Sequence, residues 1–168
     1  GTLAWPPSRP STPTSRATIL AGKFVGVFII VVVQAVVVMT ASAIAFKIYW
    51  GQPMTIALLT IGLVVIATGF GLFLLSFVKT VRQGGVVIGG VLSVTAMLGG
   101  LFTVAIPNMP SIFKTLGLFM PQGWPLRGWL QALDNAGPLD VLLPLSVMLI
   151  LGAIFFTLAV AIFRKRFA

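Results

Sequence analysis

The hydrophobic positions of this chain form four long, continuous blocks. They occupy residues 24–46, 55–78, 84–106 and 141–163, and none of them contains a charged residue. Each block is long enough to cross a hydrocarbon core of roughly 30 Å at about 1.5 Å per residue. The apolar runs do not alternate with polar positions, as the strands of a membrane barrel would. The pattern therefore predicts four transmembrane helices.

The segment between the third and fourth blocks has a different pattern. Apolar residues recur at helical spacing over residues 111–120 and again over 125–134. A breaker run separates the two stretches, Pro121-Gln122-Gly123-Trp124-Pro125. Both stretches are too short to span a membrane. We therefore expect an all-α integral membrane fold of four transmembrane helices, with an extracytoplasmic re-entrant pair of short amphipathic helices between the third and the fourth.

The distribution of basic residues predicts the orientation. If the four spans alternate in direction, eight of the eleven Lys and Arg residues share one side, namely Arg9, Arg16, Lys23, Lys79, Arg82, Arg164, Lys165 and Arg166. The richer side is expected to be cytoplasmic. Both ends of the chain should then be cytoplasmic. We expect the protein to lie in the plasma (inner) membrane as a multi-pass protein.

Composition excludes most soluble functions. The chain is 58% hydrophobic and 8% charged, whereas a soluble domain is about 25% charged. Its net charge of +9 is spread between the apolar blocks, so we expect membrane lipid rather than nucleic acid as the counter-charge.

The inventory of reactive side chains is small. The chain has no Cys and no His, and its two acids, Asp134 and Asp140, do not form the convergent pair that acid and base catalysis needs. We therefore expect no catalytic residue, no metal site and no cofactor in this chain, and no enzymatic activity of its own.

Small residues follow one face of the third block. They are Gly85, Gly89, Ser93, Ala96 and Gly100, and they project within an arc of about 80° if each residue turns about 100°. Such a face allows another helix to approach closely. Packing within a helix bundle is the interpretation we favour, and lining of a substrate path is the alternative.

The first block carries two polar positions of interest, Gln34 and Ser42. The amide of Gln34 would be costly in hydrocarbon without a partner. We favour a structural hydrogen bond between helices for it, while both residues remain candidates for a translocation path.

The order of these parts resembles type-2 ABC exporter permeases. Three features carry the resemblance: a Gly1-Thr2-Leu3 opening, a stretch that ends in Gly22-Lys23 just before the first span, and Pro121 to Leu126, which is similar to a Pro-x-x-Trp-x-Leu element between two outer helices. The chain is similar to the C-terminal part of such a permease, about four of six spans. The resemblance implies two further spans before Gly1.

The resemblance also implies roles and partners. Residues 1–23 would form a cytoplasmic coupling segment, with Arg16, Gly22 and Lys23 at the contact with an ABC ATPase subunit, and residues 24–168 would form the transmembrane domain. ATP and Mg would bind to that ATPase, and a second permease copy or a related permease would complete the path. Pro121, Gly123 and Trp124 would form an outer gate or interface. From the residues alone, a snorkelling anchor is the interpretation we favour for Lys23, whereas an aromatic belt residue and an outer gate are equally consistent with Trp124.

Two alternatives to an exporter permease remain. One is a scaffold or assembly subunit without transport activity, which would share every compositional feature but would not copurify with an ATPase. The other is a membrane-embedded enzyme, which would have to work without His, Cys or paired acids. The resemblance does not select among the lipids, drugs, peptides and glycans that the family moves.

Overall fold

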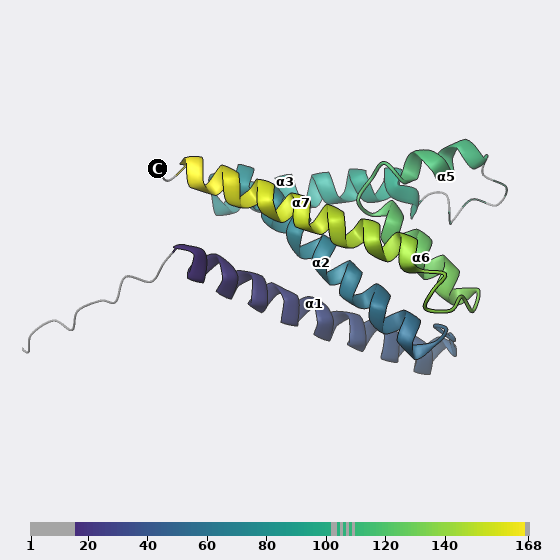
Figure 1. Ribbon diagram of the computed structural model, residues 1–168. Helices are drawn as coiled ribbons and strands as arrows, with labels where there is room; N and C mark the ends of the chain where they lie inside the picture. The colour runs from purple at the N-terminus through teal and green to yellow at the C-terminus, as the bar shows by residue number, and fades with distance from the viewer. Residues whose placement is uncertain (1–15, 102–103, 105, 107, 109, 167–168) are drawn as a thin grey trace, which may run out of the picture.

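The computed structural model of the chain describes residues 16–101, 104, 106, 108 and 110–166 (Figure 1). The described residues form helices and connecting loops without a strand. The elements are α1 (Arg16–Phe46), α2 (Pro53–Phe77), α3 (Val81–Ala96), the π-helical turn η1 (Met97–Leu101), α5 (Ser111–Gly117), α6 (Gly123–Leu133) and α7 (Leu142–Arg166).

Four stretches of this structure are long and apolar enough to cross a membrane: Val25–Phe46, Pro53–Phe77, Gln83–Leu101 and Leu142–Lys165. This confirms the predicted all-helical fold with four candidate spans. Helices α5 and α6 lie at one end of the bundle (Figure 1). The opposite end holds the first turn of α1, the junction of α2 with α3 and the last turn of α7.

The centre of the bundle is the pairing of α2 with α7. Buried positions recur every seven residues on both helices, at Thr55, Gly62, Gly69 and Ser76 on α2 and at Leu145, Gly152 and Ala159 on α7. A seven-residue repeat keeps the contact on one face of each helix and is typical of helices that cross at about 20°.

Two glycines bring the backbones of α2 and α7 together. A Cβ atom added to Gly69 would collide with the carbonyl oxygen of Gly152 and would lie 3.1 Å from the Gly152 Cα atom. A Cβ atom added to Gly152 would lie 2.7 Å from Cγ1 of Val65 and 2.9 Å from its carbonyl carbon. Because lipid supplies no hydrophobic drive between helices, such close van der Waals contact is what holds a membrane pair together.

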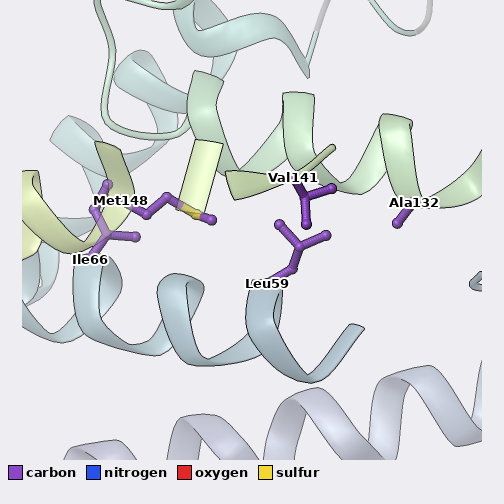
Figure 2. Close-up of a cluster of buried hydrophobic side chains, with 5 residues drawn as sticks. All are labelled: Leu59, Ile66, Ala132, Val141 and Met148. Carbon is purple, nitrogen blue, oxygen red and sulfur yellow. The ribbon is translucent and has the colours of Figure 1, made fainter. Parts of the chain in front are cut away.

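A cluster of five buried side chains joins this pair to α6 (Figure 2). Leu59 and Ile66 come from α2, Met148 comes from α7, Val141 immediately precedes α7, and Ala132 comes from α6. The cluster fixes α6 against the end of the central pair.

The loop between α1 and α2 is held against the end of α6. Gly51 has a φ of +99°, and a Cβ atom there would collide with the carbonyl oxygen of Ala132, so both the backbone angle and the space require glycine. The hydroxyl of Thr55 donates a hydrogen bond of 3.1 Å to the carbonyl of Ala136. The start of α2 is therefore tied directly to the segment that follows α6.

The third span contains a distortion. Helix α3 passes into the π-helical turn η1, where Gly100 has a φ of +120°, and the predicted end of this span near Ile106 lies in a stretch that the structure describes only in part. Glycine tolerates this angle because it lacks a Cβ atom. The distortion places η1 beside α5 and α6.

In contrast to α2, the first span is almost unpacked. No residue in the apolar window of α1 is buried, whereas half of the window of α2 is. Helix α1 contacts α2 and otherwise presents apolar side chains outward, such as Ile30 and Ile44. These faces are suited to lipid or to another membrane helix.

Candidate functional site

Three buried glycines join α5 and α6 to the end of the third span. A Cβ atom added to Gly123 would collide with the carbonyl oxygen of Gly117, and one added to Gly117 would lie 3.1 Å from the carbonyl oxygen of Gly99. One added to Gly99 would lie 3.2 Å from the backbone nitrogen of Gly123. The backbones of η1, α5 and α6 thus touch at one point. Gly123, a predicted outer-gate residue, lies at this contact.

Trp124 fixes the shape of the hairpin formed by α5 and α6. Its indole Nε1 donates a hydrogen bond of 2.8 Å to the carbonyl of Leu118, at the end of α5. The Arg127 guanidinium lies 5.7 Å from the centre of the Trp124 ring, within cation–π range. Pro121 lies in the turn just before them and is half-buried. The predicted gate residues therefore sit together where the hairpin turns.

A hydrogen bond connects the hairpin to the third span. Gln122 Nε2 donates to the hydroxyl oxygen of Thr95 at 2.8 Å, and that hydroxyl donates in turn to the carbonyl of Val91 at 2.7 Å. Sequence reasoning identified Gln122 only as part of a breaker run. A polar side chain beside a predicted outer hairpin, with a Thr near the end of the neighbouring span, is the signal that could have indicated this link.

The two candidate path residues on α1 are not brought together at a common site. Gln34 is exposed, and its amide has no hydrogen bond to the part of the chain that the structure describes. The hydroxyl of Ser42 donates to the carbonyl of Val38 at 2.7 Å and accepts from Nε1 of Trp50 at 3.2 Å. A role for both residues in a translocation path stays a prediction.

Trp50, which sequence reasoning missed, bridges α1 and α6. Its Nε1 also donates to the carbonyl of Met39 on α1 at 3.2 Å. Its ring meets the ring of Trp129 on α6 edge-on, with the ring centres 5.8 Å apart. The residue lies in the short loop after the first span and precedes a glycine, and no periodicity distinguishes it, so only the folded chain indicates this role.

The small-residue face of the third span is open over its first half and packed at its end. Cβ atoms added to Gly85 or Gly89 would meet nothing within 4 Å, and Ser93 is exposed. Ala96 is half-buried, and Gly100 is buried at the hairpin. The described chain supplies no partner for the open half, so its packing role stays a prediction that a second chain would have to fulfil.

The predicted coupling segment falls partly outside the described residues, which begin at residue 16. Arg16 is the first residue of α1, and Gly22 and Lys23 lie in its early turns, ahead of the apolar window that begins at Val25. The side chains of Arg16 and Lys23 are also outside the described part, whereas Gly22 is exposed. With 31 residues, α1 is about 46 Å long, about 16 Å more than the hydrocarbon core requires. Its excess length places these residues beyond the apolar window.

Comparison with known proteins identifies relatives of this chain. The profile of a family described as ABC-2 family transporter protein matches residues 10–161. The linearmycin resistance permease protein LnrN of Bacillus subtilis (strain 168) is 27% identical over 144 residues, which are 84% of this chain and 37% of that protein. The chain therefore spans little more than a third of the length of this relative. No solved structure matches the chain.

The family match covers most of the sequence, including all four apolar helices up to the last turns of α7. It confirms the resemblance to type-2 ABC permeases. The chain belongs to the ABC-2 family of transporter proteins and is a multi-pass membrane protein with four apolar helices.

Proposed function

We propose that the protein containing this chain is the membrane subunit of an ATP-driven exporter in the plasma membrane. The family match over residues 10–161 is the observation that carries this proposal. The printed sequence has no GxxxxGK[ST] phosphate loop. An ABC ATPase subunit, with which permeases of this family generally work, would bind ATP and Mg and hydrolyse the nucleotide.

In the proposed orientation, the end of the bundle that carries the start of α1 and the end of α7 is cytoplasmic. Lys79, Arg164 and Lys165 lie at this end, in agreement with the positive-inside rule. Trp50, Trp124 and Trp129 gather at the opposite end, as headgroup-level aromatic residues do.

The hairpin would form the extracytoplasmic re-entrant pair. Helices α5 and α6 have 7 and 11 residues and are therefore about 10 and 16 Å long, too short to cross the core. They would dip into the outer leaflet or lie on it, with Pro121, Gly123 and Trp124 at the turn that closes the path.

A continuous series of contacts could transmit movement from the ATPase to this gate. Closure of two ATPase subunits would displace the early turns of α1 near Arg16 and Lys23. Trp50 is hydrogen-bonded to the outer part of α1 and packs on Trp129 of α6, so it would pass the displacement to the helix that carries Trp124. The open faces of α1 and α3 would be covered by a second permease copy or a related permease, and the path would lie between the two.

Purification of the full-length protein from its native membrane tests this proposal. We expect an ATPase subunit to copurify and the complex to hydrolyse ATP. Lys23→Glu should weaken this association because it reverses a charge at the proposed contact. Lys47→Glu is the matched control, since Lys47 follows the opposite end of α1. A purified complex without a nucleotide-binding subunit would overturn the exporter and favour the scaffold.

A further inference from the structure

A hollow of about 470 Å³ opens between η1, α5 and α6. Two cationic side chains line it, Lys114 from α5 and Arg127 from α6. The two acids of the chain, Asp134 and Asp140, do not line it, and Asp140 accepts a hydrogen bond of 2.8 Å from the backbone nitrogen of Gly137. The hollow therefore carries positive charge without a carboxylate of its own, and its complement is an anion.

The position of Arg127 is set before any ligand arrives. The side chain is half-buried and lies 5.7 Å from the centre of the Trp124 ring. That ring is fixed in turn by its hydrogen bond to the carbonyl of Leu118. A guanidinium held in this way loses little conformational entropy when it binds a phosphate in its planar fork of donors.

The rest of the wall is mostly apolar: Leu118, Leu126, Leu130 and Val104 line it, beside Thr115 and three glycines. An inorganic anion would neutralise the cations but leave this wall uncovered. A molecule with an anionic head and a hydrocarbon chain would satisfy both parts, because burial of apolar surface is favourable at roughly 25 cal/mol per Å². The chemistry of the lining thus matches an anionic amphiphile.

We propose that this hollow binds one anionic phospholipid, with its phosphate between Lys114 and Arg127 and an acyl chain along Leu118, Leu126 and Leu130. The site lies on the hairpin at the end of the membrane-length helices, where lipid headgroups would meet it. The inference rests on the proposed placement of α5 and α6 at the membrane surface. It does not depend on ATP-driven export.

Native mass spectrometry of the full-length protein tests the site. The protein is solubilised in micelles that contain equal amounts of phosphatidylglycerol and phosphatidylcholine, and the retained lipids are counted. We expect one phosphatidylglycerol to be retained in preference to phosphatidylcholine. The double variant Lys114→Gln, Arg127→Gln should reduce that preference at least about tenfold, because it removes two charge-assisted hydrogen bonds.

Lys47→Gln is the matched control. It removes one positive charge at the same end of the bundle from a side chain that does not line the hollow, and it should leave retention unchanged. Should the double variant fail to fold, Lys114→Gln alone serves, because Lys114 is exposed; it should still lower the preference severalfold.

Three results would overturn the proposal. The first is equal retention of the two lipids, and the second is retention of phosphatidylglycerol that the Lys114 and Arg127 substitutions do not change. The third is displacement of the lipid by millimolar inorganic phosphate, which would make the hollow a site for a free anion. None of these readouts uses ATP hydrolysis, so a failure of the lipid site and a failure of the exporter proposal are distinguishable.

Discussion

The contact between Gly69 of α2 and Gly152 of α7 offers a direct test of the central helix pair. The two backbones touch there, and a Cβ atom on Gly69 has no free space. Gly71, two residues further along α2, has nothing within 4 Å of an added Cβ atom. Gly69→Ala and Gly71→Ala therefore add the same methyl group to the same helix, one at the contact and one away from it.

Two effects of opposite sign determine the expected change in stability. Replacing glycine by alanine in a helix interior is favourable by roughly 0.5–1 kcal/mol. Adding carbon to a packed contact costs about 1–3 kcal/mol, and Gly69 belongs near the upper limit because its neighbours are backbone atoms, which have no alternative rotamer. Gly69→Ala should therefore destabilise the protein by about 2 kcal/mol, or about 30-fold in the folding equilibrium. Gly71→Ala should be neutral or slightly stabilising.

Unfolding of the full-length protein in mixed micelles, titrated with sodium dodecyl sulfate and followed by circular dichroism, measures this difference. The double variant Gly69→Ala, Gly152→Ala adds a further check. Both methyl groups separate the same two helices, so the cost of the pair should be less than the sum of the single costs. If Gly69→Ala unfolds at the same detergent fraction as Gly71→Ala, the close crossing of α2 and α7 is wrong.

Three further substitutions test the hairpin and the open face. Thr95→Val removes the acceptor of the Gln122 side chain and should lower stability by about 0.6–1.7 kcal/mol. Hydrogen exchange should become faster in α5 and α6 while α2 and α7 keep their rates. Uniform acceleration would contradict a local link. Trp124→Phe removes the indole donor to the carbonyl of Leu118 and should lower stability in thermal unfolding by about 1 kcal/mol. An unchanged unfolding midpoint would show that this bond does not hold the hairpin. Gly89→Leu adds a side chain where the chain leaves open space, so it should leave the unfolding midpoint unchanged. It should lower the dimer fraction found by cross-linking. An unaltered dimer fraction would exclude this face of α3 from the contact between two permease copies.

The secondary structure was predictable because it depends on local composition. Membrane insertion of a helix follows from the hydropathy of about 20 consecutive residues, and the four apolar blocks supply it. The short helices were detectable by their 3.6-residue periodicity, although their limits moved. The second was expected over residues 125–134, whereas α6 begins at Gly123. The structure includes Pro125 in the first turn of α6, where a missing N–H costs no helical hydrogen bond.

The pairing of helices was harder to predict, because a small-residue face shows only that a helix can be approached closely. We singled out the third span, yet the glycines at Gly85 and Gly89 have no neighbour in the described chain. The second span has an equally regular set, Thr55, Gly62, Gly69 and Ser76, and its two glycines meet α7. Its seven-residue spacing, matched by Gly152 and Ala159, was the signal available in the sequence. Recognising it required comparing spans with one another rather than reading each one separately.

The unequal packing of the spans has a mechanical consequence. The central pair is fixed by backbone contact at Gly69 and Gly152, within a seven-residue repeat of buried positions, so it is suited to act as a rigid frame. Helix α1 has no buried residue in its apolar window, and near its C-terminal end it is held by Trp50, which is bonded to Ser42 and packs on Trp129. A force applied to the early turns of α1 would thus move that helix against the frame, and its connection through Trp50 leads to α6. Because α6 carries Trp124 and contacts η1, the hairpin is the element that such a displacement would reach.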